Sequence, residues 1–223
     1  MRVNHISERF NQVQDAISQA CHRARRREEE ITLIAVTKTW PAEVVQAATE
    51  VGLTDFGENK VQELIAKAPL FPENKWHMIG HLQRNKARQV MTHAQDFHAL
   101  DNLRLAGTLN RLAAEAGRIF PCFIQVNVSR EDSKFGIIPD GVGEFVIALE
   151  EFESIKIKGL MTLASPDIRK VREEFQLLRS IRNKHERLIG TGLSMGMSGD
   201  YEIAIEEGAT HIRLGSALFG VRQ

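Results

Sequence analysis

The sequence has no excess of charge of either sign and no long apolar run. Lysine plus arginine and aspartate plus glutamate each number 29, so the formal net charge is zero. A neutral chain generates no strong field to attract DNA, RNA or acidic lipids, so we expect no nucleic-acid partner. No apolar run approaches the roughly 20 residues of a membrane-spanning helix, so we expect no membrane association.

Cysteine is also scarce, and the N-terminal segment has no apolar core. The two cysteines, Cys21 and Cys122, show neither the spacing of a metal site nor that of a redox motif. The first ten residues, MRVNHISERF, do not resemble a secretion signal. We therefore expect a cytoplasmic protein without a metal site.

Short segments rich in β-branched residues alternate with segments of helical periodicity along the chain. Residues 6–28 have the apolar stripe of an amphipathic helix, and 31–38 (ITLIAVTK) is typical of a buried strand. Helical patterns separate the later strands. The predicted strands are 31–38, 54–58, 76–80, 97–101, 122–128, 155–162, 189–195 and 211–215.

This alternation predicts a parallel sheet with right-handed crossovers, and eight such units close into a barrel. We therefore predict one (β/α)8 TIM barrel over residues 1–223, with an additional N-terminal helix. Only a short tail follows the last strand, so we expect the N-terminal helix to fill the gap beside it. An open sheet of six strands is the alternative, if weak segments such as 54–58 are loops.

Lys38 lies at the end of the first predicted strand. Period-two alternation places Ile34, Val36 and Lys38 on one face. Barrels of this kind have their chemistry at the C-terminal ends of the strands. If this face points inward, desolvation favours the neutral amine, which attacks an aldehyde to form a Schiff base. The alternative is a solvated surface lysine.

The C-terminal stretch is rich in glycine and predicts a phosphate site. Ser198 and Gly199 precede a predicted helix, where backbone N–H groups bind anions, although Asp200 is alternatively a simple helix cap. Arg213 and Gly215 share a face of the last predicted strand, and buried arginine needs an acceptor. Loops after strands seven and eight often bind phosphate in this fold. Ordinary turns remain the alternative.

Two further features have competing interpretations. His77 and His81 have the spacing of a metal pair on a helix, but they fall across a predicted strand end and loop. We interpret them as a barrel-mouth histidine and a loop histidine. Lys134 follows the fifth strand and is either an exposed loop lysine or one that handles the ligand.

Seven segments resemble the motifs of the pyridoxal phosphate homeostasis protein family, also called the proline synthetase co-transcribed family. Together they extend in order over nearly the whole chain. The barrel of this family resembles the N-terminal domain of alanine racemase, which has the fold type III architecture. The segments are AVTKTW (35–40), DFGENKVQE (55–63), WHMIGHLQRNK (76–86), QVNVSREDSKFG (125–136), GLM (159–161), LSMGMSGD (193–200) and IRLGSALFG (212–220).

The resemblance implies a pyridoxal 5'-phosphate (PLP) site and a role for each of its residues. Lys38 corresponds to the lysine that binds PLP, Arg213 to the arginine that faces the pyridine nitrogen, and Asn59 lies near the cofactor. Ser216 replaces a threonine that is common in the family, and it keeps the hydroxyl group. The residues expected to hold the phosphate are Ser198, Gly199, Gly215 and Ser216.

The same residues argue against efficient catalysis. Arg213 keeps its proton, so the PLP ring nitrogen stays neutral and the ring is a weak electron sink. A related racemase takes an opposing tyrosine from a second domain, whereas the only tyrosine here, Tyr201, falls in a predicted helix. We therefore assign no catalytic residue. We expect a monomer that carries PLP as a Schiff base in vitamin B6 and amino-acid homeostasis, with PLP-dependent apoenzymes as partners.

Two other functions remain as alternatives. The first is a weak PLP-dependent racemase or decarboxylase that acts on an amino acid. The second is a barrel that binds phosphorylated metabolites without PLP, with Lys38 as a charge or an imine-forming base.

Overall fold

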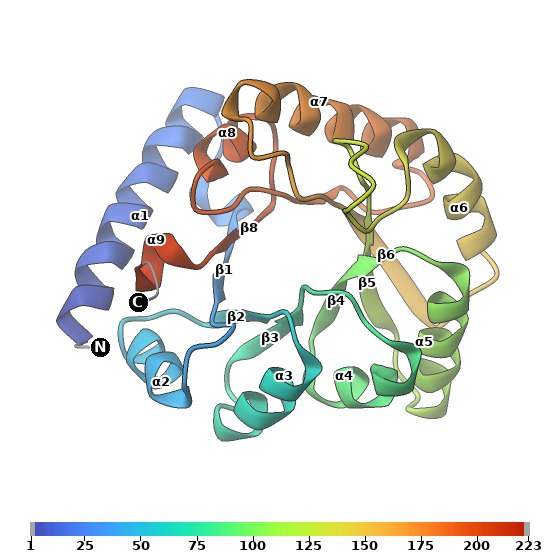
Figure 1. Cartoon of the computed structure of the whole chain (residues 1–223), viewed down its shortest axis with the longest axis horizontal. Helices are drawn as coiled ribbons and strands as arrows, with labels where there is room; N and C mark the ends of the chain where they lie inside the picture. Colours follow the sequence, from blue (N-terminus) through green and yellow to red (C-terminus); the bar gives the residue numbers. More distant parts are fainter. Residues whose placement is uncertain (1–2, 221–223) are drawn as a thin grey trace.

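The computed structural model describes residues 3–220 and shows parallel strands that close into a barrel surrounded by helices (Figure 1). Each strand pairs with the next in sequence, and β8 closes the barrel against β1. This confirms the predicted (β/α)8 fold and excludes the open sheet. The strands are β1 (Thr32–Val36), β2 (Asp55–Glu58), β3 (Lys75–Met78), β4 (Asp96–Leu100), β5 (Phe120–Gln125), β6 (Ile155–Met161), β7 (Gly192–Ser194) and β8 (His211–Leu214).

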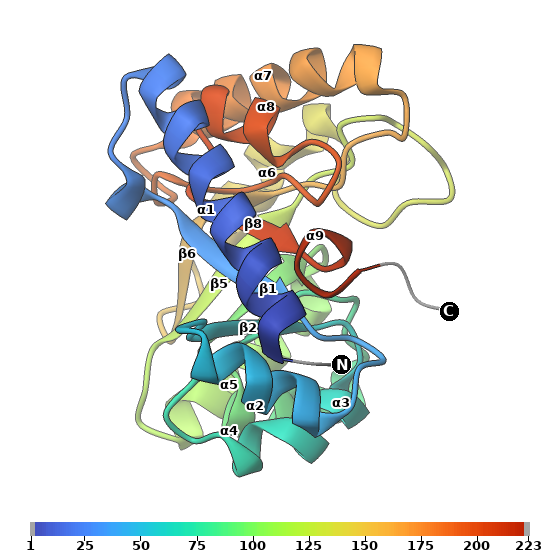
Figure 2. The ribbon, with the colours of Figure 1, turned by 90° about the vertical axis from the view of Figure 1, so that its left-hand side faces the viewer.

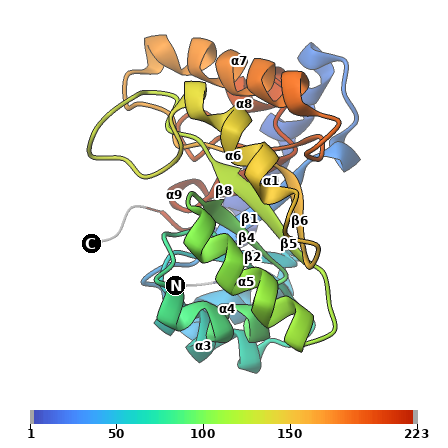
Figure 3. The same ribbon diagram turned by 90° about the vertical axis from the view of Figure 1, so that its right-hand side faces the viewer.

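The helices occupy the outside of the barrel, as the figures show from two further sides (Figures 2 and 3). Among the described residues, no helix has the length and apolar character needed to cross a membrane. The α-helices are α1 (Val3–Ala24), α2 (Ala42–Glu50), α3 (Val61–Lys67), α4 (Ala87–His93), α5 (Leu103–Glu115), α6 (Val142–Leu149), α7 (Ile168–His185), α8 (Tyr201–Glu206) and α9 (Ser216–Phe219).

Helix α1 closes the ring of helices beside the last strand. It packs against α8, α9 and α2, and it runs along the outside of β1 and β8 (Figure 2). Its predicted apolar stripe is the buried face, with Val13, Ile17 and Ala20 almost fully covered. The expectation that this helix fills the gap left by the short C-terminal tail is therefore confirmed.

The barrel separates two layers with different chemistry. Between strands and helices lies a continuous apolar cluster that includes Ala35 of β1 and Phe56 of β2. Inside the barrel, Ile34 of β1 lies beside Gly57, where an added Cβ would be only 2.8 Å from Ile34 Cγ2. The interior also contains polar side chains that hydrogen bond across the barrel, such as His98 of β4 with Ser194 of β7. This differs from the branched apolar filling that is usual in such barrels.

Strand β1 is shorter than the sequence pattern predicted. It ends at Val36 rather than at Lys38, because the chain turns immediately after the strand. Thr39 has a positive φ of 62°, and the Trp40 amide donates to the Thr37 carbonyl. Lys38 therefore lies in a tight turn just beyond the strand, at the C-terminal end of the barrel.

Candidate functional site

A cavity of about 770 Å³ opens at the C-terminal ends of the strands. Its lining, which comes entirely from within residues 3–220, contains two cationic side chains and no aspartate or glutamate. Such a lining favours an anionic ligand. All seven residues predicted from the sequence line this cavity: Lys38, Asn59, Ser198, Gly199, Arg213, Gly215 and Ser216.

The turn that contains Lys38 is fixed by contacts on both sides of it. On one side, the Thr37 hydroxyl donates to Glu58 Oε1 at 2.7 Å, and the Thr37 carbonyl accepts from Lys67 Nζ at 2.8 Å. On the other side, the Thr39 amide donates to the carboxylate of Glu63. Lys38 itself is half-buried. The backbone of this lysine is therefore held in place while its side chain reaches the cavity.

The groups that hold this turn form a buried ion cluster behind it. Lys67 Nζ lies 2.7 Å from Glu58 and 3.2 Å from Glu63. Burial raises the pKa of the Glu58 carboxyl, although hydrogen bonds from Lys67 and Thr37 oppose this shift. Removing Lys67 would leave that carboxylate buried without its cation, which is strongly unfavourable. We call Glu58, Glu63 and Lys67 the wall cluster.

Asn59 follows β2 and lies where two strand ends approach closely. An added Cβ on Gly80 would be 2.2 Å from the Asn59 carbonyl oxygen, so only glycine fits beside it. Both residues line the cavity. Their contact fixes the edge of the cavity next to Lys38.

The glycine-rich end forms a set of converging donors. The amides of Gly215 and Ala217 both donate to Ser198 Oγ, at 3.3 and 3.1 Å. An added Cβ on Gly199 would meet nothing within 4 Å, and one on Gly215 only ordinary contacts, so packing does not require glycine at either position. Asp200 precedes α8 but accepts from the Met197 amide instead of capping the helix. The Gly215 and Ala217 amides are therefore bonded to Ser198, whereas Ser198, Gly199 and Ser216 line the cavity with hydroxyl and backbone groups.

Arg213 lies at the floor of the cavity and is almost fully buried. Its Nη1 donates to Ser194 Oγ at 2.6 Å, and its Nη2 to the Thr162 carbonyl at 2.8 Å. Burial lowers the pKa of Arg213 to about 10, so the guanidinium remains charged at neutral pH. The sequence predicted that this buried arginine needs hydrogen-bond acceptors. The protein itself supplies two of them, Ser194 Oγ and the Thr162 carbonyl.

Three further residues at the mouth of the cavity, His81, Phe135 and Gln125, were not among the predicted site residues. The rings of His81 and Phe135 stack with centroids 4.2 Å apart, although Phe135 is 57% exposed. Gln125 donates to the Phe135 carbonyl at 3.0 Å and also lines the cavity. Phe135 is part of the motif SKFG, but the sequence does not indicate whether this phenylalanine or the adjacent Lys134 faces the cavity.

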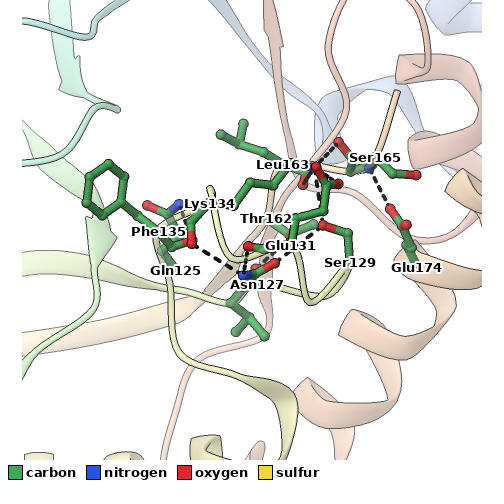
Figure 4. Close-up of polar contacts among 12 residues, drawn as sticks. Gln125, Asn127, Ser129, Glu131, Lys134, Phe135, Thr162, Leu163, Ser165 and Glu174 are labelled. Carbon is green, nitrogen blue, oxygen red and sulfur yellow. Dashed lines mark hydrogen bonds and ion pairs between the residues drawn. The ribbon is translucent and has the colours of Figure 1, made fainter. Parts of the chain in front are cut away.

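Lys134, in contrast, does not line the cavity. Its Nζ lies 2.7 Å from Glu131 and donates to Ser129 Oγ and to the carbonyls of Leu163 and Ala164 (Figure 4). These contacts join the loop after β5 to the segment after β6. Lys134 therefore fits neither interpretation as stated, because it is a partly buried lysine that ties two loops together and does not line the cavity.

His77 lies elsewhere than predicted. It is buried inside the barrel, between Asp55 and Asp96 at the N-terminal ends of β2 and β4. The interpretation as a barrel-mouth histidine is therefore wrong, because β3 ends only at Met78 and the mouth lies beyond it. His81 does line the mouth. Tyr201 packs in α8 and does not line the cavity.

Comparisons with known proteins agree with this geometry. The family of alanine racemase N-terminal domains matches residues 13–223. The pyridoxal phosphate homeostasis protein of Escherichia coli K12 is 39% identical over 231 residues, which cover 99% of this chain and 98% of that protein. This chain belongs to the pyridoxal phosphate homeostasis protein family.

Solved structures place this homeostasis-family chain among similar barrels. PipY of Synechococcus elongatus with PLP bound is 32% identical, with a TM-score of 0.85 over 96% of this chain and all of PipY. Alanine racemase of Clostridium difficile is 15% identical, with a TM-score of 0.77 over 98% of this chain and 56% of the racemase. The second likeness shows that the family shares the barrel of alanine racemase.

Proposed function

We propose that this chain binds PLP covalently through the amine of Lys38 and carries it in vitamin B6 and amino-acid homeostasis. The observation on which this rests is the convergence of all seven predicted residues on one cavity without a carboxylate. The family membership and the PLP bound to PipY support the choice of ligand.

The cavity fits the three functional parts of PLP. The hydroxyls of Ser198 and Ser216 and the backbone at Gly199 and Gly215 line the same end of the cavity and would hold the phosphate. Lys38 follows β1, the strand that pairs with β8, and its amine would reach the aldehyde from there. When bound, PLP supplies an electrophilic carbon and an electron sink.

Arg213 favours a carrier over an efficient enzyme. Its guanidinium keeps its proton at neutral pH, so toward the pyridine nitrogen of bound PLP it would donate a hydrogen bond and no proton. The residues within 3–220 that line the cavity include no tyrosine to act as a second base opposite Lys38. We therefore expect negligible exchange of amino-acid α-protons, measured by loss of the NMR signal in deuterated buffer. Exchange at the rate of a metabolic enzyme would instead support the racemase or decarboxylase alternative.

We further propose that residues 1–223 act as one cytoplasmic, monomeric barrel that delivers PLP to PLP-dependent apoenzymes. The support is that all seven predicted site residues meet in one cavity of this chain, so the proposed site invokes no residue of a second copy. Sedimentation over a range of concentrations should show a monomer, or a weak dimer that leaves the cavity unchanged. A tight obligate dimer would contradict this part of the proposal.

Covalent attachment has a direct test. Protein mixed with PLP should show a visible absorbance band, and borohydride reduction followed by peptide mapping should place one pyridoxyl group on Lys38. Lys38→Ala should abolish both signals. Lys134→Ala is the matched control and should leave both unchanged. A label mainly on Lys134 would refute the assignment, and the absence of any band would favour the barrel that binds other phosphorylated metabolites.

A further inference from the structure

A chain of buried polar side chains crosses the interior of the barrel beneath Arg213. Consecutive members are within hydrogen-bonding distance of each other, and most lie on different strands. Burying such groups is costly unless each one finds a partner, whereas apolar side chains would fill the same space without that cost. We call this chain the core relay; its members are Arg213, Ser194, His98, Asp96, His77 and Asp55.

The charges at both ends set the direction of the hydrogen bonds. Arginine can only donate, so Ser194 Oγ accepts from Arg213 Nη1 at 2.6 Å. Because a hydroxyl can accept a second hydrogen bond, the direction of the 2.8 Å bond between Ser194 Oγ and His98 Nδ1 depends on which nitrogen of His98 is protonated. Burial lowers the pKa of His98, so the ring is neutral and carries one proton. His98 Nε2 lies 3.0 Å from the Asp96 carboxylate, which favours the proton on Nε2 and leaves Nδ1 to accept from the Ser194 hydroxyl.

The far side of His98 faces a buried carboxylate. Nε2 is 3.0 Å from Asp96 Oδ1, although the bond angle is poor, so this is an electrostatic contact between an N–H group and a carboxylate. His77 Nδ1 lies 2.7 Å from the same oxygen, and His77 Nε2 lies 3.0 Å from Asp55. With a carboxylate at each nitrogen, His77 carries two protons, and its pKa rises to about 9 despite burial.

The charges of the core relay members consequently balance. Arg213 and His77 are cations, and Asp96 and Asp55 are anions. His77 contacts both carboxylates, whereas the neutral His98 and Ser194 separate Arg213 from Asp96. Outside the relay, the carboxylate of Asp200 also acts on the charge of Arg213. His211, whose ring centroid is 5.6 Å from that of His98, is kept neutral because burial lowers its pKa to about 3. His98 and Ser194 connect the buried anion Asp96 to Arg213 on the cavity floor through one charge contact and two hydrogen bonds.

A bound metal ion is the competing explanation for part of this chain. The ligand atoms of His77, Asp96 and His98 lie within 4.8 Å of one another. However, both ring nitrogens are already within 3.0 Å of the same carboxylate oxygen. The protonation that the relay requires at both nitrogens also blocks the lone pairs a metal would use.

We propose that Ser194 and His98 are positioning residues, which orient the Arg213 guanidinium on the cavity floor and connect it to the carboxylate of Asp96. Thr162 fixes the second Nη group through its carbonyl, so the guanidinium is held at two points. The effect on PLP rests on the proposed function. The tautomer of His98 and the immobility of Arg213 do not, and they can be measured without any ligand.

The first experiment uses the protein without added PLP. In ¹⁵N-labelled protein at pH 7, NMR should show His98 protonated only on Nε2 and His77 protonated on both nitrogens. The Nη–H signals of Arg213 should be resolved, because two hydrogen bonds restrict rotation of the guanidinium. His98 protonated on Nδ1, or averaged Arg213 signals, would overturn the proposal.

Matched variants separate positioning from stability. Ser194→Ala should average the Arg213 signals and weaken PLP binding roughly tenfold, the loss of one charge-assisted hydrogen bond. Ser194→Thr keeps the hydroxyl and should restore both. His98→Asn places an amide oxygen near the Nδ1 position and should retain more affinity than His98→Gln, which places its amide near Nε2. Thermal melting identifies any variant that fails to fold.

The outcomes distinguish this inference from the proposed function. If the wild type binds PLP but Ser194→Ala binds it equally well with resolved Arg213 signals, the positioning role is refuted and PLP binding stands. If the wild type binds no PLP, the proposed function fails. The relay is then judged by NMR alone, and Arg213 signals that are resolved in the wild type and averaged in Ser194→Ala still support it.

Discussion

Buried charged groups lie behind both the turn that contains Lys38 and the strand that contains Arg213. They hold the backbone of the turn in the first case and the side chain of the arginine in the second. The wall cluster binds the backbone on either side of Lys38, through Thr37 and Thr39. In the core relay, Ser194 binds the guanidinium of Arg213 directly. A nucleophilic amine needs a side chain that can still move, whereas a permanent cation acts best from a fixed position.

The largest effect on stability should come from removing the cation of the wall cluster, Lys67. Lys67→Met leaves Glu58 buried without its cation and should lower the free energy of unfolding by about 3–5 kcal/mol, measured with urea. Burial already raises the pKa of Glu58, and losing Lys67 raises it further. A carboxyl with a raised folded pKa stabilises at low pH and loses that contribution as pH rises.

The destabilisation by Lys67→Met should therefore be smaller at pH 5 than at pH 8. The double variant Glu58→Gln/Lys67→Met removes both charges and should recover much of the loss at either pH. An equal loss at both pH values would show that packing, rather than charge, dominates in the wall cluster.

The contribution of the core relay to stability should also fall as pH rises, through the titration of His77. The folded pKa of His77, about 9, lies above its ordinary value of 6.5. Its contribution is complete below about pH 6.5 and is lost as pH rises through 9, a decrease of about 3 kcal/mol. His77→Gln should remove this part of the slope in urea unfolding between pH 6.5 and 9. If stability depends on pH equally in the variant and the wild type, the titration of His77 makes no contribution to it.

If Lys38 binds the aldehyde of PLP and Arg213 faces its ring, the phosphate must bind at the glycine-rich end of the cavity. Pyridoxal, which lacks the phosphate, should then bind about a hundredfold more weakly than PLP, roughly 3 kcal/mol. Ser198→Ala should narrow that ratio, because one of the proposed phosphate donors is lost. Titration of the visible band measures both affinities. Equal affinities for PLP and pyridoxal would show that Ser198 and Gly215 belong to ordinary turns and do not bind the phosphate.

The smallest effect should come from Glu63, at the exposed edge of the wall cluster. Glu63→Gln keeps an oxygen that can accept from the Thr39 amide and loses only the partly solvated ion pair with Lys67. We expect a loss of stability of about 0.5 kcal/mol and a small change in the rate of PLP attachment to Lys38. A loss as large as that of Lys67→Met would show that Glu63, rather than Glu58, is the main partner of Lys67.

Much of the site followed from the order of residues along each strand. Period-two alternation placed Val36 and Lys38 on one face, and both line the cavity. Arg213 and Gly215 were assigned to one face for the same reason, and both line it as well. The strand boundaries were less accurate, as at Lys38, because the turn at Thr39 depends on contacts with Glu63 that lie 24 residues away in sequence.

The sequence by itself determined the barrel and placed Lys38, Arg213 and Gly215 at its mouth, since these depend on local periodicity and on which residue follows each strand. Only the tertiary structure decided what lies behind them. His98 and Ser194 are 96 residues apart and meet because β4 and β7 face each other across a closed barrel. His77 was misplaced for the same reason. Its partners, Asp55 and Asp96, come from neighbouring strands whose register no local pattern specifies.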